Sequence, residues 1–334
     1  MSEKDGGAKD SERARDHARD HAGEAHWDAA WRREAPAPVN LDDTSLRNHV
    51  NLRLGRLLDR LLGHLPGHPA GHPAGHPAGH SANHLADRLS ENPPGNPQRR
   101  ERPVIVEAGC GGSAWLPVFA TRYGCDVLGV DYSPRGCALA WATLERAGAP
   151  GRIVEADLFN PPAEVAGELA ACADVVFSQG LAEHFTPTSA LTKRLAWLLK
   201  PGGLAVTIVP NMRGITGLAQ RLADRRIFGL HVPLGPGELA LAHAEAGLTP
   251  LEQGWLGTLN LGVVNCSGLP RGLGRPLELA LAGASMAVWS LERLFGVELP
   301  SAFASPLVYC AARKPRRDEA GTAPETAKGS AGPE

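Results

Sequence analysis

The stretch at residues 104–113, Val-Ile-Val-Glu-Ala-Gly-Cys-Gly-Gly-Ser, limits the folds open to this chain more than any other feature. Its β-branched run ends in an acid, Glu107, and a turn with Gly109 and Gly111 then leads into a helical pattern over residues 114–123. Glycine permits positive φ and lets a ligand approach the main chain, and a helix start offers unpaired N–H groups. The stretch therefore predicts a nucleotide-type binding site.

Strand-like runs alternate with helical segments after residue 103. This alternation predicts right-handed βαβ units around a parallel sheet, and the continuous apolar run at 104–106 fits a sheet covered on both faces. The expected strands are 104–106, 126–130, 152–155, 174–178, 204–209, 249–255 and 307–313, and the expected helices are 114–123, 135–147, 163–171, 187–199 and 236–247.

The 334 residues divide by composition into seven parts. Trp27 and Trp31 share one helix face, and leucines recur with helical spacing over 44–62, so a helical cap is expected before the core. The parts are a disordered tail (1–25), the helical N-terminal cap (26–62), a low-complexity His/Pro/Gly loop (63–101), an α/β core (102–256), a helical insertion (257–304), a last strand (305–314) and a second disordered tail (315–334).

Composition excludes several classes of protein. Lys and Arg number 34 against 36 Asp and Glu, which gives no electrostatic reason to expect a nucleic-acid or membrane partner. The six cysteines are far apart with no CxxC pair, which indicates free thiols of a reducing compartment. The N-terminus is too charged for a secretory signal, and the longest apolar stretch, 277–291, is too short to span a bilayer. We expect a soluble, cytoplasmic protein.

Histidines recur in the low-complexity loop at positions 64, 68, 72, 76, 80 and 84. Histidine-rich runs can chelate zinc or nickel. The alternative is a repeat expansion in a surface loop, and proline at every fourth position prevents a helix that would align the imidazoles. We favour the repeat expansion and expect no metal site in the protein.

Acidic and polar residues follow the predicted strands at informative positions. Asp131 ends the second strand, 22 residues after Gly109, where a nucleotide-binding sheet presents an acid to ribose hydroxyls. Asp157 ends the third strand, and Glu183 and His184 follow the fourth. Ligands of open α/β sheets bind outside the carboxyl ends of the strands, so these side chains are expected to meet in one crevice.

Five segments in this order resemble the motifs of class I S-adenosylmethionine-dependent methyltransferases. They are Glu107-x-Gly-x-Gly, Gly-Val-Asp131-Tyr-Ser, Ala-Asp157-Leu-Phe, Ser178-Gln-Gly-Leu-Ala-Glu-His-Phe and Leu199-Lys-Pro-Gly-Gly-Leu-Ala. The resemblance covers about residues 103–255 and returns with the strand near 307. It implies a doubly wound, mostly parallel seven-stranded sheet of the Rossmann-like methyltransferase fold, with an N-terminal helical lid and a helical insertion before the last strand. S-adenosylmethionine is the implied cofactor.

The resemblance also implies a role for each matching residue. Gly109 and Gly111 would pass under the methionine and ribose, with Glu107 nearby, and Asp131 would hold both ribose hydroxyls. The adenine would meet the remaining residues, which are Tyr132, Asp157, Leu158 and Gln179. Ser113 departs from the pattern, because the usual turn has a third glycine there. Purely structural roles remain open for Asp131 as a helix cap, for Asp157 as a turn residue or cap, and for Tyr132 in packing.

Methyl transfer to a hydroxyl requires an acceptor held in line and a group that takes its proton. His184 is the candidate base, with a structural role as the alternative. Glu183 would orient His184 or contact the cofactor amino group, and His231 is a weaker candidate for the acceptor pocket. The lack of a basic face favours a small-molecule acceptor, so the expected function is a small-molecule methyltransferase, and O-methylation is one option.

Two other functions stay open. A non-catalytic S-adenosylmethionine-binding scaffold would keep the same cofactor residues. An NAD-dependent oxidoreductase shares a glycine turn and a ribose acid, but the turn here lacks the GxGxxG spacing. A related transferase that moves an aminopropyl group is disfavoured because the predicted covers of the site are not acidic.

Overall fold

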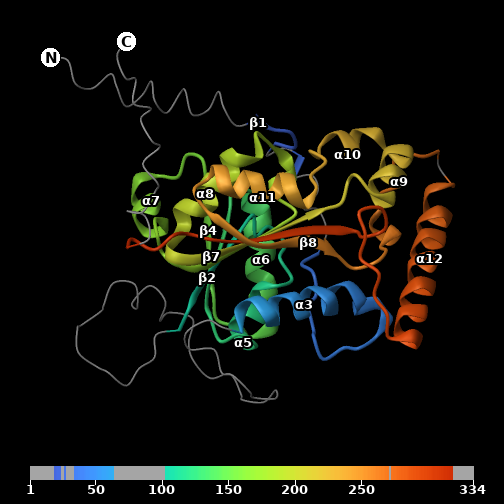
Figure 1. Cartoon of the computed structure of the whole chain (residues 1–334), viewed down its shortest axis with the longest axis horizontal. Helices are drawn as coiled ribbons and strands as arrows, with labels where there is room; N and C mark the ends of the chain where they lie inside the picture. Colours follow the sequence, from blue (N-terminus) through green and yellow to red (C-terminus); the bar gives the residue numbers. More distant parts are fainter. Residues whose placement is uncertain (1–18, 24–25, 28–33, 64–101, 271, 319–334) are drawn as a thin grey trace, which may run out of the picture.

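Seven strands form one sheet in a computed structural model that describes residues 19–23, 26–27, 34–63, 102–270 and 272–318 (Figure 1). β9 pairs antiparallel with both neighbours, and the other strands run parallel to one another. The prediction of a mostly parallel seven-stranded sheet is confirmed. In spatial order the strands are β4 (Arg152–Glu155), β3 (Asp126–Asp131), β2 (Val104–Ala108), β5 (Ala173–Gln179), β7 (Leu199–Pro210), β9 (Leu307–Arg313) and β8 (Thr249–Leu256).

Helices cover both faces of the sheet because the strand side chains alternate between two apolar cores. Ile105 packs in one core and its neighbour Val106 in the other. The first core includes residues of α3 (His49–Leu62), α5 (Leu116–Thr121) and α6 (Pro134–Ala147). The second includes residues of α7 (Ala163–Leu169), α8 (Thr188–Leu198) and α11 (Pro236–Glu245).

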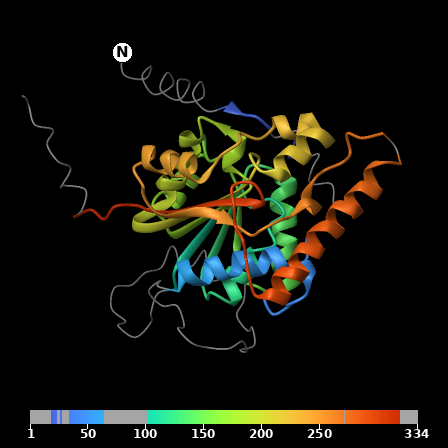
Figure 2. The same cartoon turned by 45° about the vertical axis from the view of Figure 1, so that its right-hand side comes forward.

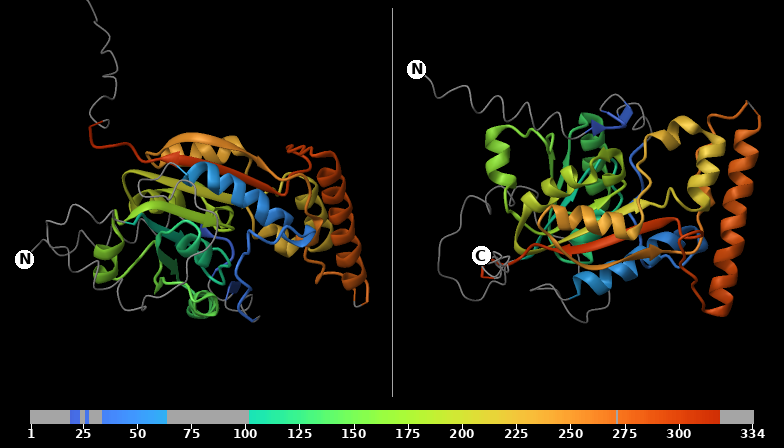
Figure 3. Two further views of the ribbon diagram at one scale, coloured as in Figure 1. Left: turned by 90° about the horizontal axis from the view of Figure 1, so that it is seen from below. Right: turned by 45° about the horizontal axis from the view of Figure 1, so that its top comes forward.

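The N-terminal helix α3 lies on a face of the sheet, below it in Figure 1 and across its underside in Figure 3. Leu54, Leu57, Leu58 and Leu62 are buried there against the strands. The leucine spacing predicted the helix, whose first turn is the 3-10 helix η1 (Leu46–Asn48). The expected place of this helix was a lid over the cofactor, and its leucines instead form part of the sheet core.

A long helix, α12 (Gly274–Phe295), stands at the side of the sheet and meets the N-terminal region (Figures 1 and 2). His49 of α3 stacks on Trp289 with ring centroids 5.0 Å apart, and its Nε2 lies 2.9 Å from a carboxylate oxygen of Glu292. Arg293 donates to the carbonyl of Thr44. The insertion at 257–304, which was expected to be helical, therefore holds this helix.

Shorter elements complete the described part of the chain. Between β7 and β8 lie α9 (Ile215–Ala223) and α10 (Arg225–Gly229), and η3 (Leu261–Val263) precedes α12. A second, two-stranded sheet pairs β1 (Arg19–Asp20) with β6 (Phe185–Thr186), just after η2 (Ala182–His184). This pairing was not predicted, because strands of two residues have no periodicity.

Some predictions fall on residues that the structure does not describe. Residues 1–18, Trp31, nearly all of the His/Pro/Gly loop and residues 319–334 lie outside the described parts. All six cysteines are described, and each is a free thiol that is buried or half-buried, as expected. No helix among the described residues has the length and apolar character needed to cross a membrane.

Candidate active site

The glycine turn after β2 is held against the end of β3. The N–H groups of Gly109 and Cys110 both donate to the carbonyl of Val130, at 2.8 and 3.2 Å. Gly109 has a φ of +74°, and a Cβ at this position would lie 3.0 Å from the side-chain methyl groups of Leu181. Only glycine adopts this positive φ and avoids contact with Leu181 without strain. The turn therefore places main chain without a side chain at the carboxyl edge of the sheet.

Ser113, the departure from the usual turn, links the turn to the helix that follows it. Its hydroxyl donates to a carboxylate oxygen of Glu107 at 2.7 Å and accepts from the N–H groups of Trp115 and Leu116 at 3.0 and 3.4 Å. Burial raises the pKa of Glu107 to about 8, although the hydrogen bond from Ser113 opposes this shift. Ser113 therefore accepts from two N–H groups at the start of α5 and donates to a buried acid.

Asp131 ends β3 facing the glycine turn. One carboxylate oxygen accepts from the N–H of Gly111 at 2.8 Å, and the other accepts from the N–H of Ser133 at 2.8 Å. The cap of α6 is Ser133, whose hydroxyl accepts from the N–H of Gly136. Helix capping is thus not the role of Asp131, and its oriented carboxylate lies where ribose hydroxyls are expected.

Tyr132 follows the end of β3, and Gln179 ends β5, on the other side of β2. The Tyr132 hydroxyl donates to Asp20 at 3.0 Å, so the N-terminal segment is tied to the predicted adenine site. Gln179 is half-buried at the end of β5, opposite Ile208 of β7. Both residues are at the carboxyl edge, as expected.

Asp157 and Leu158 follow β4. Asp157 is exposed, and its carboxylate accepts from the N–H of Phe159 at 2.8 Å, which gives it the turn role that was weighed as an alternative. Leu158 is buried in the apolar core. The end of β4 is fixed to β3, since the N–H of Ala156 donates to the carbonyl of Asp131.

Glu183 and His184 lie buried in the turn after β5. The Nδ1 of His184 is 2.9 Å from the carbonyl of Leu230, while its Nε2 is 3.6 Å from a carboxylate oxygen of Glu183. The second distance is too long for a hydrogen bond, so the Leu230 carbonyl, and not Glu183, orients the imidazole. Burial lowers the pKa of His184 to about 4 and raises the pKa of Glu183 to about 8. His184 is therefore neutral near pH 7 and is a weak proton acceptor.

Two aromatic rings lie against His184. The ring of His231 is 4.8 Å away between centroids, and the ring of Trp27 is 5.0 Å away and edge-on. His231 was the weaker candidate in the sequence, and the structure brings it to the same site. The N-terminal segment reaches the site through β1, and the N–H of His21 donates to the carbonyl of His184.

These residues fit S-adenosylmethionine. Bare main chain at Gly109 would pass under the amino acid part of the cofactor, and Asp131 would accept from the ribose. The sheet order and the residues of this site are those of a class I S-adenosylmethionine-dependent methyltransferase domain. Residues 106–207 match the family model of a methyltransferase domain.

Among similar proteins are ubiquinone biosynthesis O-methyltransferases. That of Cereibacter sphaeroides is 29% identical over 158 residues, which are 45% of this chain and 61% of the relative. That of Sinorhizobium fredii is 30% identical over 118 residues, 35% of this chain and 45% of the relative. The chain thus spans about three fifths or less of the length of these relatives. A solved structure, a putative methyltransferase from Bacillus halodurans, is 14% identical with a TM-score of 0.46 and covers 65% of this chain and 95% of its own.

Proposed function

We propose that this protein transfers a methyl group from S-adenosylmethionine to an oxygen of a small-molecule acceptor. The observation that carries the proposal is the meeting of two sets of residues at one edge of the sheet. The glycine turn and Asp131 form the first set, and Glu183 and His184 form the second. Leu181 connects them, because it packs against Gly109 and stands two residues before Glu183.

The cofactor supplies an electrophilic methyl group on a sulfonium when it is bound. The protein's part is to hold the acceptor in line and to handle its proton. Gly109, Gly111 and Asp131 would bind the amino acid and ribose, and Tyr132 and Leu158 would adjoin the adenine. Asp157 would accept from the adenine amino group with the carboxylate oxygen that does not take part in its turn.

Oxygen is favoured as the methyl acceptor because the relatives of this chain are named O-methyltransferases. A hydroxyl must lose its proton as the new bond forms. The Nε2 of His184 offers a lone pair to the acceptor hydroxyl, because its Nδ1 already donates to the Leu230 carbonyl. His184 is therefore the proposed proton acceptor, although its lowered pKa limits its strength as a base.

The cofactor assignment is tested by calorimetric titration with S-adenosylhomocysteine. Asp131→Ala should weaken binding by about 100-fold or more, since two hydrogen bonds to a charged group contribute about 3 kcal/mol. Asp126→Ala, at the opposite end of β3, is the matched control and should leave the affinity unchanged. Binding of NAD without binding of S-adenosylhomocysteine would refute the proposal.

Methyl transfer is tested with labelled cofactor on a metabolite extract and then on the purified acceptor. His184→Ala should leave S-adenosylhomocysteine binding intact and lower turnover by about 10²–10⁴-fold, the usual contribution of proton transfer. Full activity of this variant on a hydroxyl acceptor would remove His184 from the reaction. Tight cofactor binding with no transfer to any metabolite would favour the scaffold function.

A further inference from the structure

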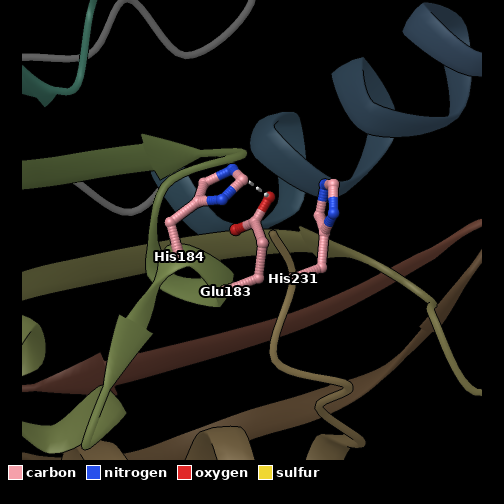
Figure 4. Close-up of side chains that lie close together, drawn as sticks. All are labelled: Glu183, His184 and His231. Carbon is pink, nitrogen blue, oxygen red and sulfur yellow. Dashed lines mark ion pairs between the residues drawn. The ribbon is translucent and has the colours of Figure 1, made fainter. Parts of the chain in front are cut away.

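Three potential metal ligands lie together after β5, although the sequence led us to expect none. One ligand atom from each of Glu183, His184 and His231 lies within 4.8 Å of the other two. Figure 4 shows the Glu183 carboxylate between the two imidazole rings. His184 and Glu183 come from η2, while His231 comes from the loop after α10, so the cluster joins two separate parts of the chain.

Both imidazoles are held in the form that binds metals. The Nδ1 of His184 lies 2.9 Å from the Leu230 carbonyl, and the Nδ1 of His231 lies 2.8 Å from the Ile227 carbonyl. A carbonyl oxygen only accepts, so each Nδ1 carries the proton and each Nε2 presents a lone pair. Metal-binding histidines characteristically donate their second N–H to a carbonyl or carboxylate in this way.

Glu183 needs a partner that the described residues do not give it. Its side chain is 1% exposed, and its Oε2 makes no hydrogen bond within the described parts of the chain. Its Oε1 is 3.6 Å from the Nε2 of His184, and no described Lys or Arg forms an ion pair with it. Burying a polar group without a partner costs free energy, and a cation would give Oε2 a partner.

We propose that Glu183, His184 and His231 bind one divalent cation that carries the acceptor oxygen in the proposed methyl transfer. Two imidazoles and one carboxylate suit Zn²⁺, Mn²⁺, Fe²⁺ or Co²⁺ and leave coordination positions open. Ligand bonds of about 2.1 Å require the three side chains to close in from the present separations by small rotations. This inference rests on the proposed function and names the way in which the acceptor hydroxyl is activated.

A cation at this position changes the part that His184 plays. Its Nε2 lone pair would bind the metal instead of receiving a proton. A hydroxyl bound to the metal would lose its proton to solvent at a lower pH than the free hydroxyl. The resulting oxygen anion would form a bond to the methyl carbon as the bond from that carbon to the sulfonium sulfur breaks, and S-adenosylhomocysteine would be the leaving group. If His184 acts as a base without a metal, methyl transfer should continue after the metal is removed. If the cation activates the acceptor, methyl transfer should stop when a chelator removes the cation.

The test uses the full chain, freed of metal with EDTA and titrated with Co²⁺, whose visible absorption reports coordination by nitrogen and oxygen. The variants are Glu183→Gln, which keeps the size of the side chain, and His231→Asn. Glu238→Gln, at an exposed glutamate paired with Arg213, is the matched control. The histidine-rich stretch at 64–84 is present in every sample, so its contribution cancels in the difference spectra. Circular dichroism confirms that each variant is folded.

The wild type and Glu238→Gln should bind one more Co²⁺ per chain than Glu183→Gln and His231→Asn. Equal uptake by the wild type and Glu183→Gln would overturn the inference, whether or not methyl transfer proceeds. S-adenosylhomocysteine titrations of the same samples separate the two proposals. A wild type that takes up the extra Co²⁺ but does not bind S-adenosylhomocysteine would leave the metal site standing and refute the methyltransferase proposal.

Discussion

Ser113→Ala tests the link between the glycine turn and the rest of the core. The change removes the donor to Glu107, whose carboxyl is buried, at a cost of about 1–3 kcal/mol. It also removes the hydroxyl that accepts from the N–H groups of Trp115 and Leu116 at the start of α5, and a loss of this kind costs about 1 kcal/mol. The sum is about 3 kcal/mol, which for a domain of this size lowers the melting temperature by roughly 6–12 °C.

Ser133→Ala provides the control for this prediction. Ser133 is also buried, and its hydroxyl caps α6 by accepting from the backbone N–H of Gly136. Its loss should cost about 1 kcal/mol, or roughly 2–4 °C. Both variants are melted in parallel by circular dichroism at one pH. If Ser113→Ala lowers the melting temperature by only the roughly 2–4 °C expected for the loss of a backbone-capping hydroxyl, the bond to Glu107 contributes nothing and the reasoning is wrong.

Three further predictions concern other parts of the molecule. Glu107 has a folded pKa of about 8 against 4.5 unfolded, so the folded chain keeps a proton that the unfolded chain has lost. Wild-type stability relative to Glu107→Gln should therefore fall by about 1.4 kcal/mol per pH unit between pH 5 and 8, and a flat difference in urea unfolding would contradict this. Gly109→Ala should destabilise by about 1–2 kcal/mol more than Gly124→Ala, because both have positive φ but only the first Cβ meets a neighbour, Leu181; equal melting temperatures would count against the contact. Trp289→Ala should cost about 3–5 kcal/mol and speed hydrogen exchange across the insertion between β8 and β9, because the indole N–H donates to a carbonyl at 2.6 Å; unchanged exchange would show that the helix is held by other contacts.

The sheet could be predicted because each strand is indicated by a pattern within a few consecutive residues. The run Val104-Ile-Val with its following acid, and similar runs further on, show the composition of strands that are buried on both faces, and each predicted strand is present. The positions of Gly109 and Asp131 followed from the same pattern, since they end neighbouring strands. The Asp131 carboxylate accepts from the N–H of Gly111, because parallel pairing of β2 and β3 brings the turn after β2 to the end of β3.

The features that were not predicted depend on contacts that form only when the chain folds back on itself. The tautomer of His184 is set by Leu230, which is 46 residues away in sequence. The bond from Ser113 to Glu107 is close in sequence, but it depends on how the turn folds back on its strand. The leucines of α3 indicated a helix, yet nothing in their spacing showed whether it would cover the cofactor or the sheet.

β9 lies between β7 and β8 in the sheet, so the last strands of the sheet can pair only in one order. β8 pairs with β9 and not with β7 in the described sheet, so β8 has no strand to join until β9 has been made. A ribosome needs roughly 3–11 s to add the 57 residues from the end of β8 to the end of β9. During that time β7 exposes an unpaired edge, which is a site where nascent chains associate wrongly. Chaperones that bind extended strands should therefore act on this protein late in its synthesis.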